Sequence, residues 1–175
     1  MDFKTLANQY RNELLDNVLP FWLEHSQDLE FGGYFTCLDR KGGVFDTDKF
    51  IWLQGREVWM FSMLYNKVEK RQEWLDCAVQ GGEFLKKYGH NGDYNWYFSL
   101  NRSGRPLVEP YNIFSYTFAT MAFGQLSLAT GSQEYADIAK KTFEIILSKV
   151  DNPKGKWNKL HPDTRNLKNF ALPMI

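Results

Sequence analysis

The 175-residue sequence predicts an all-α fold made of stacked helical hairpins, with short β-hairpins between them. Several segments carry apolar residues at three- and four-residue steps, the period of an amphipathic helix. Two aromatic segments, YFTCLDRKG at 34–42 and YFSLNRSG at 97–104, resemble each other at an offset of about 62–63 residues. A buried-looking helix and a more amphipathic one follow each copy, so a repeating unit is predicted. Such a stack can curve into an α/α toroid with its loops on one face.

The first helix is predicted over residues 3–19, because one stripe of this segment is apolar at helical spacing. The stripe contains Phe3, Leu6, Tyr10, Leu14 and Val18. Pro20 interrupts the pattern, since proline has no N–H to donate and clashes with the preceding turn. The helix is expected to resume briefly through His25. An extended segment over 32–40 and a turn at 41–43 follow.

The first repeat unit continues with a long helix predicted over about 48–70. Asp46 and Thr47 are its predicted N-caps, because their side-chain oxygens can accept from free N–H groups of the first turn. A second helix is predicted over 72–88. Its core-facing stripe is expected to contain Trp74, Ala78, Gly81, Leu85 and Tyr88.

The second unit begins with an extended segment at 95–100 and a turn at Ser103-Gly104. The helix predicted over 111–129 is apolar on most sides and is expected to be buried. The next helix is predicted over 133–149, with Ser132 as N-cap. Its inward face is expected to contain Tyr135, Ile138, Ala139, Thr142, Phe143 and Ile146.

Residues 151–166 predict a polar loop, and a further apolar segment begins near Leu167. The final stretch, 169–175, is apolar and has no cap or polar tail. Two hairpin units cannot close a ring, and an open edge would leave apolar helix faces in water. Residues 1–175 are therefore predicted to be the N-terminal portion of one larger toroid domain, and to be inactive by themselves.

Composition limits the function classes. The 21 basic and 21 acidic residues give zero formal net charge, which removes the electrostatic case for binding nucleic acid or an anionic membrane. The sequence contains no apolar run near the roughly 20 residues that span a bilayer, and no signal-peptide pattern. Cys37 and Cys77 lack metal-ligand spacing and are expected to be free thiols of a cytoplasmic protein. No metal site is predicted. The 17% aromatic content fits either a sugar pocket or packing between helices.

Arg56 is the most informative single residue, because it lies inside the aromatic and aliphatic run FIWLQGREVWMF at 50–61. A cation there must point into water, pair with an acid or face a polar cavity, since an unpaired buried charge costs several kcal/mol. An ion pair with an acid on a neighbouring helix and a ligand-binding role both remain open on these grounds.

Several motifs together resemble the acylglucosamine branch of the N-acylglucosamine 2-epimerase and cellobiose 2-epimerase superfamily. They are NVLPFW at 17–22, GGYFTCLDR at 32–40, DKFIWLQGREVW at 48–59, PYNIFS at 110–115 and DNPKGK at 151–156. Each motif is weak alone, and the resemblance covers essentially the whole chain. It implies an (α/α)6 barrel, of which this chain supplies the N-terminal part.

The resemblance implies interconversion of N-acetylglucosamine and N-acetylmannosamine. In this reaction the sugar ring opens, a base removes the C2 proton, an enediolate forms, and a proton returns to the opposite face. The chemistry needs two acid–base groups and a cation or donor near the oxyanion. The family uses a histidine pair, which His25, His90 and His161 do not match, so the pair is expected beyond residue 175. No cofactor is required.

For the site, the resemblance implies that Arg56 faces the central cavity and stabilises the enediolate. Trp52 lies one turn before Arg56 on the same helix face and is a candidate for substrate binding. The other substrate-binding candidates are Tyr111, Phe114 and Ser115, at the start of the second inner helix. Core packing is the alternative role for Trp52 and Phe114.

Some relatives are activated by ATP that they do not consume, which draws attention to Lys154, Lys156 and Lys159 near a glycine. Such a loop can hold phosphates by charge and backbone N–H groups, although no P-loop pattern is present. The alternative is a solvated connecting loop. Family members often form homodimers, so a dimer of the complete protein is a further expectation.

Three other functions compete. A mannose or cellobiose 2-epimerase or aldose–ketose isomerase would keep the fold and change the substrate. An (α/α)6 glycoside hydrolase would need two carboxyl groups flanking a glycosidic bond, and no such pair stands out in the sequence. A non-catalytic sugar-binding or interaction protein is the third, because a toroid alone does not fix function. Two downstream histidines would favour the epimerase.

Overall fold

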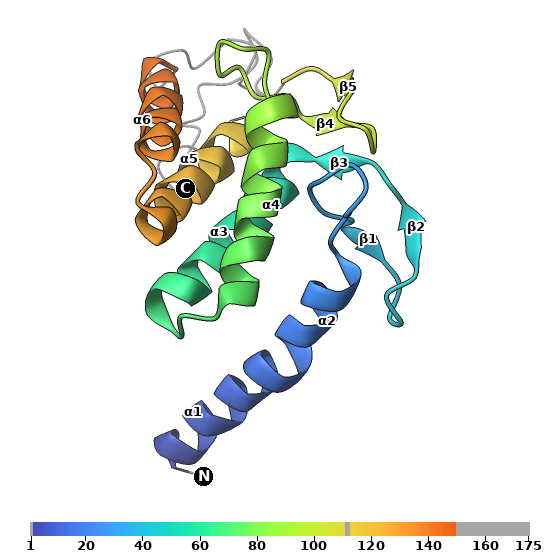
Figure 1. Cartoon of the computed structure of the whole chain (residues 1–175), viewed down its shortest axis with the longest axis vertical. Helices are drawn as coiled ribbons and strands as arrows, with labels where there is room; N and C mark the ends of the chain where they lie inside the picture. The colour runs from blue at the N-terminus through green and yellow to red at the C-terminus, as the bar shows by residue number, and fades with distance from the viewer. Residues whose placement is uncertain (1, 111–112, 150–175) are drawn as a thin grey trace, which may run out of the picture.

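The computed structural model describes residues 2–110 and 113–149. Helices dominate this part of the chain, and two short β-hairpins lie beside their ends (Figure 1). The helices are α1 (Phe3–Asn12), η1 (Glu13–Val18), α2 (Leu19–His25), α3 (Ile51–Lys67), α4 (Gln72–Tyr88), α5 (Phe114–Thr130) and α6 (Gln133–Ser148). The strands are β1 (Cys37–Leu38), β2 (Val44–Asp46), β3 (Lys49–Phe50), β4 (Ser99–Leu100) and β5 (Pro106–Val108). Helix α3 packs against α4 and α5, and α5 packs against α6.

The predicted repeat is confirmed by the two hairpins. Strands β1 and β2 pair in the same antiparallel way as β4 and β5, and the two hairpins lie 62 residues apart. At equivalent places, Asp39 Oδ1 and Asn101 Oδ1 each accept a hydrogen bond from the backbone N–H four residues later, at 2.9 and 2.8 Å. Gly42 and Gly104 both have positive φ, +84° and +92°, which glycine adopts without the strain other residues meet. An inner helix, α3 or α5, follows each hairpin.

The predicted break of the first helix at Pro20 is wrong. The helix runs from Phe3 to His25 and widens into a π-helical segment, η1, just before the proline. There the N–H of Leu19 donates to the carbonyl of Leu14, five residues back. This wider turn shifts the carbonyls that a proline ring would otherwise meet. The apolar stripe on α1 forms as predicted but is exposed in the described part of the chain, with Phe3 at 93%.

The helix predicted over 48–70 is shorter, because it begins at Ile51 and ends at Lys67. The predicted caps Asp46 and Thr47 are wrong: the N-cap is Phe50. Strand β3 pairs with β4 through Lys49 opposite Leu100, which keeps the backbone extended up to the helix. This pairing joins residues 51 positions apart, so local propensity could not reveal it.

Helices α4 and α6 agree closely with prediction, and Ser132 caps α6 by accepting from the N–H of Tyr135. Phe143 is the exception, since 49% of it is exposed although it was predicted to face inward. The buried side of α6 is centred on Ile138 and Thr142, and Phe143 lies about 100° further round the helix.

Close helix packing depends on glycines in α3 and α4. A Cβ on Gly55 would lie 2.9 Å from the backbone carbon of Phe118, so glycine lets α5 approach α3. A Cβ on Gly81 would lie 2.2 Å from the Tyr34 hydroxyl oxygen, which donates to the carbonyl of Cys77. The aromatic ring of Tyr34 thereby anchors the loop before β1 into α4.

A buried ionic cluster joins the loops at one end of the helices. Asp28 and Lys49 are fully buried, and Lys49 Nζ lies 2.9 Å from Asp28 Oδ2. Lys49 also donates to the carbonyls of Gly32 and Arg102, at 2.6 and 2.8 Å. The guanidinium of Arg102 donates to both carboxylate oxygens of Asp28. Burial opposes ionisation of Asp28, yet the hydrogen bonds from Arg102 and Lys49 lower its pKa to about 2.

The cluster predicts a large effect of Asp28→Asn on the free energy of unfolding. The variant leaves Lys49 buried without a counter-ion, which is expected to cost about 3–5 kcal/mol. Glu30→Gln is the control, because Glu30 pairs with Arg102 at the exposed edge and should cost below about 1 kcal/mol. Urea unfolding of the complete protein measures both.

The same cluster predicts that the free energy of unfolding decreases at acidic pH. Because the folded-state pKa of Asp28 is depressed from 3.8 to about 2, its stabilisation is present above pH 3.8 and is lost as the pH falls toward 2. Equal unfolding free energies for the Asp28→Asn and Glu30→Gln proteins would contradict the assignment.

Candidate functional site

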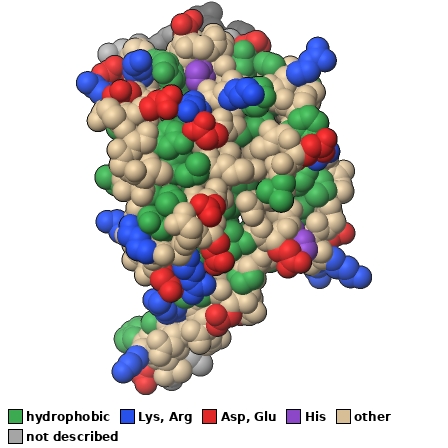
Figure 2. Space-filling model, in the orientation of Figure 1, with side chains coloured by type: hydrophobic (Ala, Val, Ile, Leu, Met, Phe, Trp, Pro, Cys, Tyr) green, Lys and Arg blue, Asp and Glu red, His purple; other side chains and the backbone are tan. Residues whose placement is uncertain are grey.

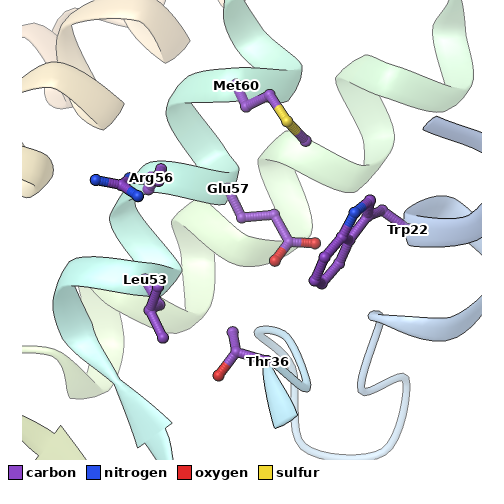
Figure 3. A pocket seen from close by; sticks show the side chains of 6 residues that line it. All are labelled: Trp22, Thr36, Leu53, Arg56, Glu57 and Met60. Atoms are coloured by element: carbon purple, nitrogen blue, oxygen red, sulfur yellow. The ribbon is translucent and has the colours of Figure 1, made fainter. Parts of the chain in front are cut away.

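One face of α3 borders a cavity of about 300 Å³ (Figure 3). Helix α3 supplies four of the lining residues, α2 supplies an indole, and the residue before β1 supplies a hydroxyl. The lining residues are Trp22, Thr36, Leu53, Arg56, Glu57 and Met60. The cavity is therefore mostly apolar, with one cation and one carboxyl group on adjacent positions of the same helix.

Arg56 lies at this cavity and rests on aromatic rings. Its guanidinium carbon is 5.1 Å from the ring centre of Trp52 and 4.6 Å from that of Phe118, within range of cation–π attraction. The residue is exposed, and no carboxylate within the described ranges pairs with it. The described residues thus give no support to a structural ion pair and leave the guanidinium available to a ligand.

The expected proximity of Trp52 to Arg56 is confirmed, whereas Phe118 is a neighbour that the sequence did not indicate. Phe118 lies one helical turn after Phe114 and reaches Arg56 only because Gly55 allows α5 to approach α3. The signal for Phe118 in the sequence is its position, one helical turn after Phe114 of the PYNIFS motif.

Glu57 is the second residue that sequence reasoning missed. It is only 7% exposed, and burial raises the pKa of its carboxyl group to about 8. The carboxyl group points toward Trp22, whereas the Arg56 side chain points toward α5 (Figure 3). The other titratable groups near Glu57 are Tyr34 and Cys77, whose pKa values are also raised by burial.

The two short contacts of Ser26 bear on the protonation state of Glu57. Ser26 Oγ lies 2.6 Å from the carbonyl oxygen of Trp22 and 2.5 Å from Glu57 Oε1. A hydroxyl has one hydrogen, so it cannot donate to two acceptors along separate directions. Both short contacts are satisfied when Glu57 is protonated and donates to Ser26, which in turn donates to Trp22. The geometry and the raised pKa therefore agree on a neutral carboxyl group.

Among the predicted site residues that the structure describes, Trp52, Phe114 and Ser115 do not line this cavity. Ser115 is 2% exposed within α5, and Phe114 is half-buried at the start of that helix. Tyr111 and the three loop lysines lie outside the described residues; the lysines are Lys154, Lys156 and Lys159.

Two histidines lie in the described part of the chain, and both have structural neighbours. His25 ends α2, packs against the tilted ring of Phe21 and lies close to Gly42 of the first hairpin turn. His90 follows α4 and its Nδ1 accepts from the N–H of Gly92, which confirms the predicted turn role. His161 lies outside the described residues. Within the described ranges, no group of three or more potential metal ligands is found.

The surface in Figure 2 agrees with the neutral composition. Acidic and basic side chains are interspersed over this face, with no large area of one sign. Among the described residues, no helix is both long and apolar enough to cross a bilayer. Cys37 and Cys77 are free, as predicted.

Comparison with known proteins identifies the family. The N-acylglucosamine 2-epimerase (GlcNAc 2-epimerase) family model matches residues 33–171. The N-acylglucosamine 2-epimerase of Bos taurus is 42% identical over 166 residues, which are 92% of this chain and 39% of that protein. That of Homo sapiens is 44% identical over 137 residues, 76% of this chain and 32% of that protein. The chain belongs to this family, and it spans about two fifths or less of the length of these relatives.

Solved structures confirm the predicted fold class. Cellobiose 2-epimerase from Bacillus thermoamylovorans B4167 matches with a TM-score of 0.79 and 27% identity, over 90% of this chain and 43% of that one. A sugar epimerase from a ruminal bacterium matches with a TM-score of 0.78 and 26% identity, over 95% of this chain and 44% of that one. The described elements are thus part of an (α/α)6 toroid with short hairpins between helical hairpins.

Glu57→Gln is expected to raise the free energy of unfolding near pH 8. The folded-state pKa of about 8 lies above the ordinary value of 4.5, so the native state holds an extra proton in that window. Stability is therefore lost as the pH rises from 4.5 to 8, with a slope approaching about 1.4 kcal/mol per pH unit. Glutamine keeps a neutral donor toward Ser26 and should remove this slope.

Urea unfolding of the complete protein from pH 5 to 9 measures the effect. Glu24→Gln is the matched control, because the side chain of Glu24 is 76% exposed and should leave the profile unchanged. Parallel pH profiles for the original and Glu57→Gln proteins would mean that Glu57 is already ionised at neutral pH.

Proposed function

We propose that the complete protein is an N-acylglucosamine 2-epimerase that interconverts N-acetylglucosamine and N-acetylmannosamine by proton transfer at C2. Support comes from relatives of that name at 41–44% identity, over 76–92% of this chain. The observation that carries the proposal is Arg56, an exposed cation on a cavity-lining helix with no carboxylate partner in the described ranges.

Arg56 is proposed to stabilise the enediolate. Negative charge develops on the sugar oxygens near C1 and C2 when the C2 proton leaves, and a preorganised cation lowers the energy of that state. The rings of Trp52 and Phe118 hold the guanidinium without neutralising it. The planar fork can donate two parallel hydrogen bonds to neighbouring oxygens, which a lysine ammonium cannot reproduce.

The two acid–base groups are proposed to lie beyond residue 175. Epimerisation requires one group on each face of C2, each with a pKa near the working pH, for which histidine is suited. In the described part of the chain, His25 contacts a hairpin turn and His90 closes another turn, and neither lines the cavity.

A mannose or cellobiose 2-epimerase is the second candidate. Its support is the cellobiose 2-epimerase structures at 23–27% identity and cellobiose 2-epimerase sequences at 27–29%. These identities are well below the 41–44% of the acylglucosamine relatives, which favours the acylated sugar.

Deuterium exchange tests the reaction directly. N-acetylmannosamine incubated with the complete protein in D2O is expected to yield N-acetylglucosamine carrying deuterium at C2, followed by NMR. Arg56→Ala is expected to lower kcat by about 10²–10³, because a charge-stabilising donor is lost. Arg56→Lys should recover only a small part of that loss.

The alternatives give different results in the same assay. Deuterium exchange into mannose or cellobiose, without exchange into N-acetylmannosamine, would show that the protein is a 2-epimerase of the same fold with a different substrate. No exchange with any of these sugars, or near-normal turnover by Arg56→Ala, would contradict the proposed mechanism.

On the family resemblance alone, the complete protein is proposed to bind a nucleotide and to form a homodimer. Its proposed location is the cytoplasm. Lys154, Lys156 and Lys159 are the proposed phosphate contacts, and the nucleotide is an effector that is not consumed. ATP is expected to raise the thermal midpoint by a few degrees, and the triple lysine-to-alanine variant should lose that shift. A midpoint unchanged by ATP would contradict the effector role.

A further inference from the structure

We propose that the cavity beside Arg56 is the subsite for the acylamino group on C2 of the sugar, an inference that rests on the proposed epimerase function. If Arg56 holds the oxygens near C1 and C2 of the open-chain substrate, the C2 substituent must lie within a few ångströms of it. The cavity that Arg56 itself lines, with a volume of about 300 Å³, is the space available there. A short acyl group fits this volume.

The apolar part of the cavity suits the acyl carbon chain. Leu53 and Met60 lie about one helical turn before and after Glu57, and both line the cavity with it. The indole of Trp22 forms the wall on the side of α2 (Figure 3). A methyl group placed among these side chains leaves water for an apolar surface, which favours binding.

The carboxyl group of Glu57 provides an acceptor for the amide N–H. Its Oε1 is engaged by Ser26, and Oε2 has no hydrogen bond from the described part of the chain. When the proton resides on Oε1, Oε2 is a carbonyl-type oxygen that accepts but does not donate. The amide N–H of the substrate can donate a hydrogen bond to this oxygen. Because the carboxyl group is neutral, it does not form an ion pair with Arg56.

Thr36 provides a donor for the acyl carbonyl. Its Oγ1 is buried and has no hydrogen-bond partner among the described residues. Buried hydroxyls are nearly always paired, so this one requires an explanation. The hydroxyl oxygen is turned away from Glu57 (Figure 3), so it needs a rotation about χ1 to donate to a carbonyl oxygen in the cavity that Thr36 lines. Together Thr36 and Glu57 offer one donor and one acceptor, the complement of a secondary amide.

This arrangement predicts discrimination against sugars with a free hydroxyl at C2. Such a sugar leaves the cavity without the acyl chain and leaves the Thr36 hydroxyl unpaired. A site whose buried polar groups lose their partners rejects the analogue more strongly than a merely apolar pocket does. The acyl group is therefore a specificity element, separate from the charge stabilisation by Arg56.

The test measures binding without turnover, using N-acetylmannosaminitol, its N-propanoyl homologue and mannitol. These reduced open-chain sugars lack the aldehyde and cannot form an enediolate. Thr36→Val, which removes the hydroxyl at constant shape, is expected to raise the Kd of N-acetylmannosaminitol about tenfold and to leave that of mannitol unchanged. Thr47→Val is the matched control, because Thr47 is exposed between β2 and β3.

A second variant probes the apolar wall. Met60→Ala enlarges the cavity and is expected to improve binding of the N-propanoyl hexitol relative to the N-acetyl hexitol by about 3–10-fold. Calorimetry on the complete protein gives all the Kd values, and thermal midpoints show whether each variant is folded.

The outcomes separate the subsite from the proposed reaction. Equal Kd values for the Thr36→Val and Thr47→Val proteins, with an unchanged acyl-chain preference in Met60→Ala, would overturn the subsite even if deuterium exchange occurs. The expected Kd changes without deuterium exchange would support the subsite and reject the epimerase function. Failure of the original protein to bind the acetylated hexitol would also overturn the subsite.

Discussion

The buried ion pair between Asp28 and Lys49 is the constraint on which the arrangement of the loops depends. It connects the loop after α2 with β3, and Arg102 extends the same cluster to the second hairpin. Each of these segments is short and could not fold alone. Because two buried charges are costly unless their hydrogen bonds are made, the cluster favours the mutual placement of the three segments in which these bonds form. Lys49 lies two residues before α3, so this placement also fixes where the cavity-lining helix begins.

Four consecutive residues of α3, from Gln54 to Glu57, each face a different part of the molecule. Gln54 exchanges two hydrogen bonds of 2.8 Å with the backbone of Tyr34, which ties the helix to the loop before β1. Gly55 lets α5 approach, Arg56 lines the cavity, and Glu57 contacts Ser26 at the C-cap of α2. Successive helical positions are about 100° apart, so each residue faces a different neighbour. Arg56 is held in place because the residues on either side of it are fixed by packing and hydrogen bonding.

Much of this architecture is encoded locally, and the parts that are not depend on tertiary contacts. Helical periodicity and turn glycines predicted α4, α6 and both hairpins, because each of these signals lies within a few residues. The start of α3 at Phe50 depends on pairing with β4, and the contact of Phe118 with Arg56 depends on Gly55. Arg56 could be singled out from its apolar surroundings. The protonation of Glu57 could not, since it follows from burial against a helix 31 residues away in sequence.

The neutral state of Glu57 explains how an acid and a base can occupy adjacent positions without cancelling each other. An ionised carboxylate beside the cavity would attract the Arg56 guanidinium and neutralise the charge that the proposed enediolate would need. Burial keeps the carboxyl group protonated, although the hydrogen bond with Ser26 acts to lower its pKa, and that hydrogen bond directs the group toward α2. The rings of Trp52 and Phe118 hold the guanidinium on the other side. No carboxylate in the described ranges pairs with Arg56, and the acid next to it in sequence, Glu57, is kept neutral by burial. The packing that buries Glu57 is therefore part of the site's electrostatics.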